Sequence, residues 1–80
     1  MTYNLSAIVS KEDNYFVARG VEIELASQGK TIEEALKNLK EAFELWLEHA
    51  EPSELSVFVK NHRPEMSNHM TLRVPRASGF

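Results

Sequence analysis

Cysteine is absent from this 80-residue chain, and its absence removes several classes of chemistry at once. Disulfide frameworks, thiolate zinc sites and cysteine nucleophiles all require a thiol. Long apolar runs are also missing, since none approaches the roughly 18 residues of a membrane-spanning helix. The N-terminus lacks the basic and apolar regions of a signal peptide. We therefore expect a cytoplasmic protein that makes no contact with a membrane.

Aspartate is nearly as scarce as cysteine, because Asp13 is the only one in the sequence. A metal-dependent nuclease needs several converging carboxylates, which are usually aspartates. Glu22 and Glu24 are two residues apart and would share one face of a strand, but Asp13 falls in a predicted turn. We expect both glutamates to be solvated at a sheet edge, and we expect no catalytic residue and no cofactor.

The histidines near the C-terminus form another candidate metal site. His62, Glu65 and His69 fall within one short segment, and side chains of both types can bind zinc. A fourth ligand is missing, and no predicted helix fixes the spacing of the three. A polar loop is therefore the preferred interpretation of this segment, and we expect no bound metal.

The net charge of −3 is unevenly distributed along the chain. Residues 1–50 carry five lysines and arginines against nine carboxylates, a balance of −4, whereas residues 51–80 carry four against three, a balance of +1. An acidic body disfavours nucleic acid as the main ligand, because phosphate binding depends on basic side chains. The same charge is compatible with a basic protein partner.

Residues 28–52 predict a long amphipathic helix around which the rest of the chain is organised. Thr31 and Glu34 have the spacing of a capping box, in which the Glu34 carboxylate reaches back to the N–H of Thr31. Pro52 disfavours helical geometry at the residue before it, so the helix should end close to Ala50. The apolar residues of helical period form one stripe: Ile32, Ala35, Leu36, Leu39, Ala42, Phe43, Trp46, Leu47 and Ala50.

Alternating polar and apolar residues over positions 2–10 predict a half-buried strand. Residues 11–14 have turn composition, so residues 15–19 should form the second arm of a hairpin. Gly29 permits a sharp turn from the sheet into the helix. The other segments are interpreted, in order, as a connection or irregular edge (21–24), a short third strand (25–28), a strand-like segment (54–60), a polar loop (61–69) and a last strand (70–75).

This order of elements predicts an α+β fold. We expect a three- to four-stranded antiparallel sheet with one amphipathic helix packed on one face, in the order β-β-β-α-β. A single domain should span residues 1–80, with its core in residues 1–60, while residues 61–80 supply a loop, a candidate last strand and a mobile tail. A chain of this size buries only roughly 60–65% of its unfolded surface, so we expect a homodimer or a higher homo-oligomer.

Three runs of the sequence, residues 15–19, 26–35 and 38–42, resemble the core signature of the HicB-like antitoxins. The resemblance covers residues 3 to about 50. It implies a partial ribonuclease H-like fold that lacks the catalytic carboxylates of the nuclease. It also implies a protein that binds and silences a HicA-type toxin, which is a small basic protein that cleaves mRNA.

The sequence departs from the family pattern at two places. Many members have a Pro-Gly turn between the second and third strands, whereas residues 20–24 here are one residue shorter and contain no proline. Members that repress their own operon carry a C-terminal DNA-binding domain. Residues 72–75 faintly resemble the opening strand of such a domain, but the chain ends before a following helix, so DNA binding is not expected.

The leading hypothesis is an antitoxin that masks its toxin without catalysing a reaction. One alternative is a stand-alone dimeric protein-binding module with the same fold and no toxin partner. The other is a ribonuclease H-like enzyme, which the small number of aspartates disfavours. The candidate partner-binding residues are chosen for predicted exposure and charge: Phe16, Glu22, Glu24, Glu33, Glu41 and Leu45.

Overall fold

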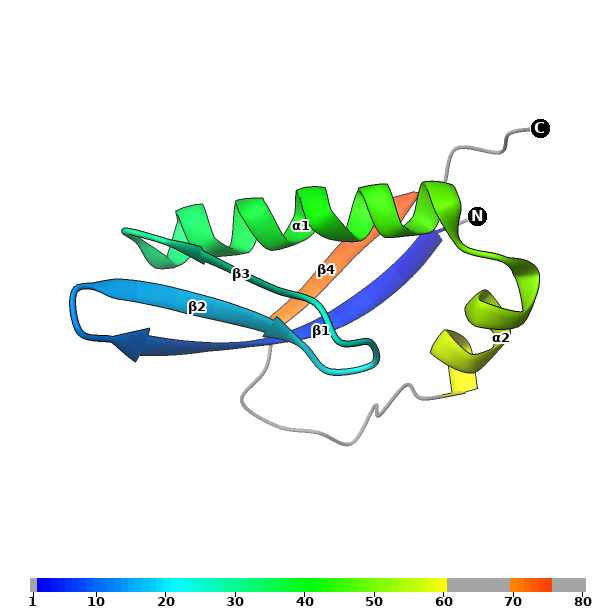
Figure 1. Ribbon diagram of the computed structural model, residues 1–80, viewed down its shortest axis with the longest axis horizontal. Helices are drawn as coiled ribbons and strands as arrows, with labels where there is room; N and C mark the ends of the chain where they lie inside the picture. Colours follow the sequence, from blue (N-terminus) through cyan, green and yellow to red (C-terminus); the bar gives the residue numbers. More distant parts are fainter. Residues whose placement is uncertain (1, 61–69, 76–80) are drawn as a thin grey trace.

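Four strands and two helices make up the structure, a computed structural model that describes residues 2–60 and 70–75 (Figure 1). The strands form one antiparallel sheet in the order β3-β2-β1-β4, and α1 lies along one face of it. The predicted α+β fold class is therefore confirmed. In chain order the elements are β1 (Thr2–Glu12), β2 (Tyr15–Gly20), β3 (Ala26–Gly29), α1 (Ile32–His49), α2 (Pro52–Lys60) and β4 (Met70–Pro75).

The central strand β1 pairs with different neighbours along its two halves. Residues 7–12 pair with β2, whereas residues 2–7 pair with β4. The predicted turn between β1 and β2 is present, and it places Asp13 at φ 25°. This left-handed backbone is one that aspartate tolerates better than most residues, because its short side chain can bond locally. The last strand is thus as the sequence predicts, whereas the hairpin has a shorter turn than predicted, because residues 11 and 12 still pair with β2.

The capping box of α1 is also present. Thr31 Oγ1 accepts a hydrogen bond from the Glu34 backbone N at 3.0 Å, and Glu34 Oε1 accepts one from the Lys30 backbone N at 2.6 Å. The second bond therefore reaches one residue before the N–H that the sequence predicted. The helix ends at His49, and Ala50 is its extended C-cap.

The apolar stripe of α1 is buried where it faces the sheet. The fully covered positions recur every four residues, at Ala35, Leu39, Phe43 and Leu47. Ile32, which was predicted on the same stripe, is 43% exposed at the start of the helix. The covered part of the stripe therefore begins about one turn later than the sequence pattern indicated.

The predicted strand over residues 54–60 is wrong, because this segment is the helix α2. Pro52 occupies the first helical position, where a missing N–H costs nothing. The Glu51 backbone N donates to Glu54 Oε1 at 2.8 Å, which caps the helix start. Leu55 and Phe58 are buried at a helical spacing, whereas the β-branched residues that suggested a strand, Val57 and Val59, are 56% exposed.

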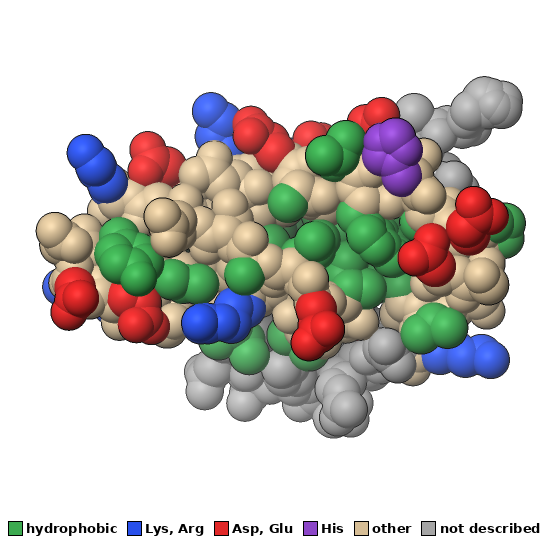
Figure 2. All heavy atoms as spheres, in the orientation of Figure 1, with side chains coloured by type: hydrophobic (Ala, Val, Ile, Leu, Met, Phe, Trp, Pro, Cys, Tyr) green, Lys and Arg blue, Asp and Glu red, His purple; other side chains and the backbone are tan. Residues whose placement is uncertain are grey.

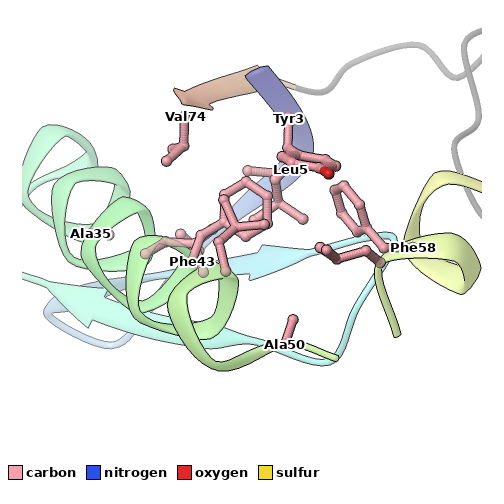
Figure 3. Packing of buried hydrophobic residues seen from close by; sticks show 12 residues of the cluster. Tyr3, Leu5, Ala35, Phe43, Ala50, Phe58 and Val74 are labelled. Carbon is pink, nitrogen blue, oxygen red and sulfur yellow. The ribbon is translucent and has the colours of Figure 1, made fainter. Parts of the chain in front are cut away.

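An aromatic cluster joins α2 to α1 and to β1 (Figure 3). The Phe58 ring centroid lies 5.4 Å from that of Phe43, 5.6 Å from Trp46 and 6.0 Å from Tyr3. These rings extend the hydrophobic core, which Leu5 and the buried face of α1 form between the sheet and the helix. In the part of the chain that the structure describes, neither helix is long and apolar enough to span a membrane.

Candidate functional site

Glu22 was predicted to be solvated and to contact a partner, and the structure contradicts its exposure. The residue is only 4% exposed. Its carboxylate accepts two hydrogen bonds of 2.8 Å from Ser6, one from the backbone N and one from the hydroxyl. Val21 N donates to Ser6 O at 2.9 Å, so Glu22 stands where the next backbone carbonyl of the β1–β2 ladder would be. The Glu22 side chain therefore supplies the hydrogen-bond acceptor that Ser6 of β1 would otherwise lack beyond the end of β2.

Glu24, Glu41 and Leu45 are exposed, as predicted. Leu45 is 58% exposed, so α1 leaves a large apolar side chain in contact with water at this position. Glu41 lies about one helical turn before it. Glu24 belongs to the connection between β2 and β3, and it lines a hollow next to the one that Leu45 lines. Glu24 and Leu45 are thus brought to one region.

Phe16 and Glu33 lie elsewhere. Phe16 is half-buried and packs against the core, and it pairs with Gly29 of β3. Glu33 is exposed in the first turn of α1, about 18 Å along the helix axis from Leu45 at 1.5 Å per residue. The predicted partner-binding set is therefore divided between the two ends of the molecule.

The hollowed region between α1, α2 and the β2–β3 connection consists of two adjoining hollows of about 400 and 480 Å³. Both are lined by Trp46 and Glu54, so they form one continuous surface, here named the Trp46 groove. Figure 2 shows apolar side chains gathered on this face of the molecule, with acidic side chains, a histidine and some basic side chains around them. The first hollow is also lined by Leu25, Leu45 and His49, and the second by Ile23, Glu24 and Val57.

The Trp46 ring packs against two other rings on one side and is partly exposed on the other. The ring stacks on Phe43 with centroids 6.1 Å apart and an interplanar angle of 17°, and it lies tilted against Phe58. It remains half-buried while lining both hollows. A fixed aromatic ring with one free side binds a partner at little entropic cost, and tryptophan is enriched among the residues that dominate binding energy. The sequence predicted that Trp46 packs in the core. This holds for the side of the ring that contacts Phe43 and Phe58, whereas the other side lines the hollows.

The groove lies in a mainly acidic region, in which Glu24 and Glu54 line the hollows, His49 lines the first hollow and Lys60 follows the region in the chain. Residues 41–59 contain five glutamates and neither lysine nor arginine. All five glutamates are exposed, and Glu24 adds a sixth carboxylate at the second hollow. The first half of α1 is different, since Lys37 and Lys40 lie among its acidic residues. The acidic character that the sequence indicated is therefore concentrated around the groove.

The signature residues between β3 and α1 have structural roles. A Cβ atom on Gly29 would lie 2.6 Å from the Ala35 backbone N, so only glycine fits this corner. Asn38 Nδ2 donates to Gln28 O at 2.8 Å and ties the helix to the strand. Together with the Thr31 cap, these contacts fix the sheet-to-helix corner. The residues of this corner thus have roles in the fold, and none of them lines the groove.

Among residues 2–60 and 70–75, no three histidine, aspartate or glutamate side chains lie close enough together to hold a metal ion. The candidate zinc ligands His62, Glu65 and His69 lie outside the described residues, as does the predicted tail after residue 75.

The groove was not predicted from the sequence, because the segment that forms α2 was interpreted as a strand. Glu54 and Val57 line it from that helix. Two signals were available: the proline followed two residues later by Glu54, and the helical spacing of Leu55 and Phe58. Either one would have placed Val57 on the outer face of a helix beside α1.

The fold and the groove together define a small α+β protein with a helix-covered antiparallel sheet and an apolar groove in an acidic surface. The chain belongs to a family of unknown function, DUF7387, whose model matches residues 4–58. It is also similar to a UPF0150 protein of Helicobacter pylori strain J99, with 41% identity over 59 residues that cover 72% of this chain and 82% of that protein. No solved structure matches the chain significantly. The family match includes every residue named above as lining the groove.

Proposed function

We propose that this chain is a HicB-like antitoxin, which binds and masks a small basic mRNA-cleaving toxin of the HicA type without catalysing a reaction. The observation that carries the proposal is the concentration of exposed carboxylates around an apolar groove at one end of the molecule. The resemblance of residues 15–42 to the HicB-like signature supports it, as does the β-β-β-α order at the start of the fold.

Masking follows from charge and shape. A toxin that cleaves mRNA must present a basic surface to the phosphates, and an acidic protein competes for that surface. A standard interface buries about 800 Å² on each partner. The chain has 5575 Å² of accessible surface, so such an interface would cover about one-seventh of it. Contact over that area excludes RNA by steric overlap, and no metal or cofactor takes part.

A cytoplasmic location and self-association belong to the same proposal. A toxin that acts on mRNA works in the cytoplasm, and its inhibitor must be present there. Self-association would use an edge of the sheet, because the outer edges of β3 and β4 carry backbone groups that can pair with a second copy.

Co-expression tests the proposal. The chain is produced with an affinity tag together with any short basic protein that is encoded next to its gene. We expect the basic protein to be captured with the chain, and we expect growth to stop when the basic protein is made alone. Capture of the basic protein without relief of growth arrest would favour the stand-alone binding module, and failure to capture it would contradict the antitoxin proposal.

A further inference from the structure

We infer that the Trp46 groove is the surface that docks the partner, and that it takes two apolar side chains of a basic protein with a lysine or arginine between them. This inference rests on the proposed function, because it names the surface and the chemistry by which the chain would hold its toxin.

The shape of the groove indicates why the partner should offer two apolar side chains. The two hollows, of about 400 and 480 Å³, are each large enough for one large side chain. Leu45 lines the first hollow and Val57 lines the second, and both are more than half exposed. Trp46 lies between them with its ring already fixed by Phe43 and Phe58. Two apolar side chains of a partner would therefore enter two adjoining hollows that share the exposed part of one fixed ring.

The carboxylates of the groove indicate why the partner should place a lysine or arginine between these two apolar side chains. Glu54 lines both hollows, so this residue lies where the two meet, and one of its carboxylate oxygens accepts the Glu51 N–H. A basic side chain between two apolar ones would reach this carboxylate, and Glu24 offers a second carboxylate at the far hollow. Nucleic acid and anionic lipid are disfavoured as occupants, because the five glutamates of residues 41–59 would repel both. A basic protein segment is the class of ligand that satisfies both the apolar walls and the acidic rim.

A second copy of the chain fits the groove poorly. In a two-fold dimer, the same patch meets itself, so Glu24 and Glu54 would face the carboxylates of their own copies. Like charges in contact oppose association. Self-association at the sheet edge leaves the groove open for the toxin.

Two double variants with the same change in charge test the inference. Leu45→Lys/Val57→Lys places two cations in the groove, whereas Ile32→Lys/Val59→Lys places two cations at exposed apolar residues that line neither hollow. All four residues are at least 43% exposed, so we expect both proteins to keep the urea midpoint of the parent. The affinity of each for the basic protein captured by co-expression is measured by calorimetry.

We expect the groove variant to lose about 100-fold or more in affinity and the control to lose less than about threefold. Equal losses would show that only total charge matters, and they would overturn the inference while the antitoxin proposal stands. Unchanged affinity in the groove variant would overturn it in the same way. If no basic protein is captured at all, the proposed function fails first, and the docking site fails with it.

A single-charge pair tests the role of the central carboxylate. Glu54→Gln keeps an oxygen that can accept the Glu51 N–H, so the cap of α2 survives. Glu44→Gln removes one charge from α1 outside the hollows. We expect a loss of about tenfold for the first and less than about threefold for the second, since removing one partner of a contact pair costs more than a distant charge. Similar effects would contradict a lysine or arginine at Glu54.

Trp46 reports directly on the groove because it is the only tryptophan of the chain. The chain is labelled with 5-fluorotryptophan, and its single ¹⁹F resonance is followed as the unlabelled basic protein is added. We expect the resonance to shift and saturate at one partner per chain. A resonance that stays in place while calorimetry records binding would show that the partner docks elsewhere. A shift produced by raising the concentration of the chain alone would identify a second copy as the occupant.

Discussion

Glu22 and Glu24 are separated by a single residue, yet the structure gives them opposite environments. Glu22 is buried against Ser6, whereas Glu24 is exposed at the edge of the Trp46 groove. Both are glutamates that alternate with apolar residues in the connection after β2, and nothing local distinguishes them. The difference arises because β2 ends at Gly20 and leaves the backbone N–H of Ser6 without its ladder partner. One carboxylate supports the fold, and the other is free to meet a partner.

We expect Glu22→Ala to lower the free energy of unfolding by about 1–3 kcal/mol, because it leaves a buried donor of Ser6 unsatisfied. Glu24→Ala is the matched control, and its effect should stay within about 0.5 kcal/mol. Urea denaturation followed by Trp46 fluorescence measures both. Equal midpoints for the two variants would show that the Glu22–Ser6 contact does not hold the end of the ladder.

Gly29 illustrates a requirement of distance rather than of backbone conformation. None of the glycines within the described residues has a positive φ, so the conformational freedom expected from the sequence is not what this position needs. What it needs is space, since a Cβ would lie 2.6 Å from Ala35 N and 2.8 Å from Glu34 Cβ.

We expect Gly29→Ala to cost about 1–3 kcal/mol of stability, as overpacking usually does. The free energy of unfolding from urea titration measures the loss. A midpoint equal to that of the parent would show that the corner between β3 and α1 opens freely to admit a methyl group.

At the scale of elements, the predictions succeeded where the determining contacts are local. The Thr31 cap, the end of α1 before Pro52 and the alternation of β1 depend on neighbours within about four residues. They failed where the contacts are distant. Phe58 belongs to the core because it meets Tyr3 and Phe43, which lie far from it in the chain. The valines beside it have strand composition, and composition outweighed the helical spacing of the two buried residues.

The groove could not be predicted for the same reason. It is assembled from α1, α2 and the connection between β2 and β3, and no single segment contains its pattern. The exposure of Leu45 and Glu24 followed from the sequence, since each depends on one element. Their proximity required the placement of α2.

The role of α2 can be tested by comparing two neighbouring residues. Phe58→Ala removes the ring that contacts three others, and we expect it to cost about 3–5 kcal/mol, which is a large part of the stability of so small a domain. Val59→Ala changes a residue that is 56% exposed, and it should cost less than about 0.5 kcal/mol. Thermal unfolding followed by circular dichroism measures both. A larger loss for Val59 than for Phe58 would restore the strand interpretation of this segment.

At the scale of the whole molecule, the surfaces available for association are of two kinds. The groove is acidic and suits a basic protein, whereas the outer edges of β3 and β4 offer backbone groups. β3 has four residues and β4 has six, so β4 gives the longer edge for pairing. Met70 on that strand is 49% exposed.

We expect the purified chain to sediment as a dimer at micromolar concentration. The Leu45→Lys/Val57→Lys variant should sediment in the same way, because the proposed dimer would use the sheet edge and not the groove. Sedimentation equilibrium distinguishes the dimer from the 9.1 kDa monomer. A single 9.1 kDa species would end the proposal of self-association, and a groove variant that alone becomes monomeric would assign the groove to the dimer.

Cleavage of RNA by the proposed basic toxin, measured as the chain is titrated into the reaction, tests masking most directly. We expect cleavage to fall in proportion to the chain added and to stop at one chain per toxin. We also expect inhibition to weaken as salt is raised from 0.1 M to 1 M, because the screening length falls from about 10 Å to about 3 Å. Cleavage that continues in the presence of a saturating amount of bound chain would contradict masking. Cleavage by the chain alone, in magnesium or manganese, would instead support the nuclease alternative.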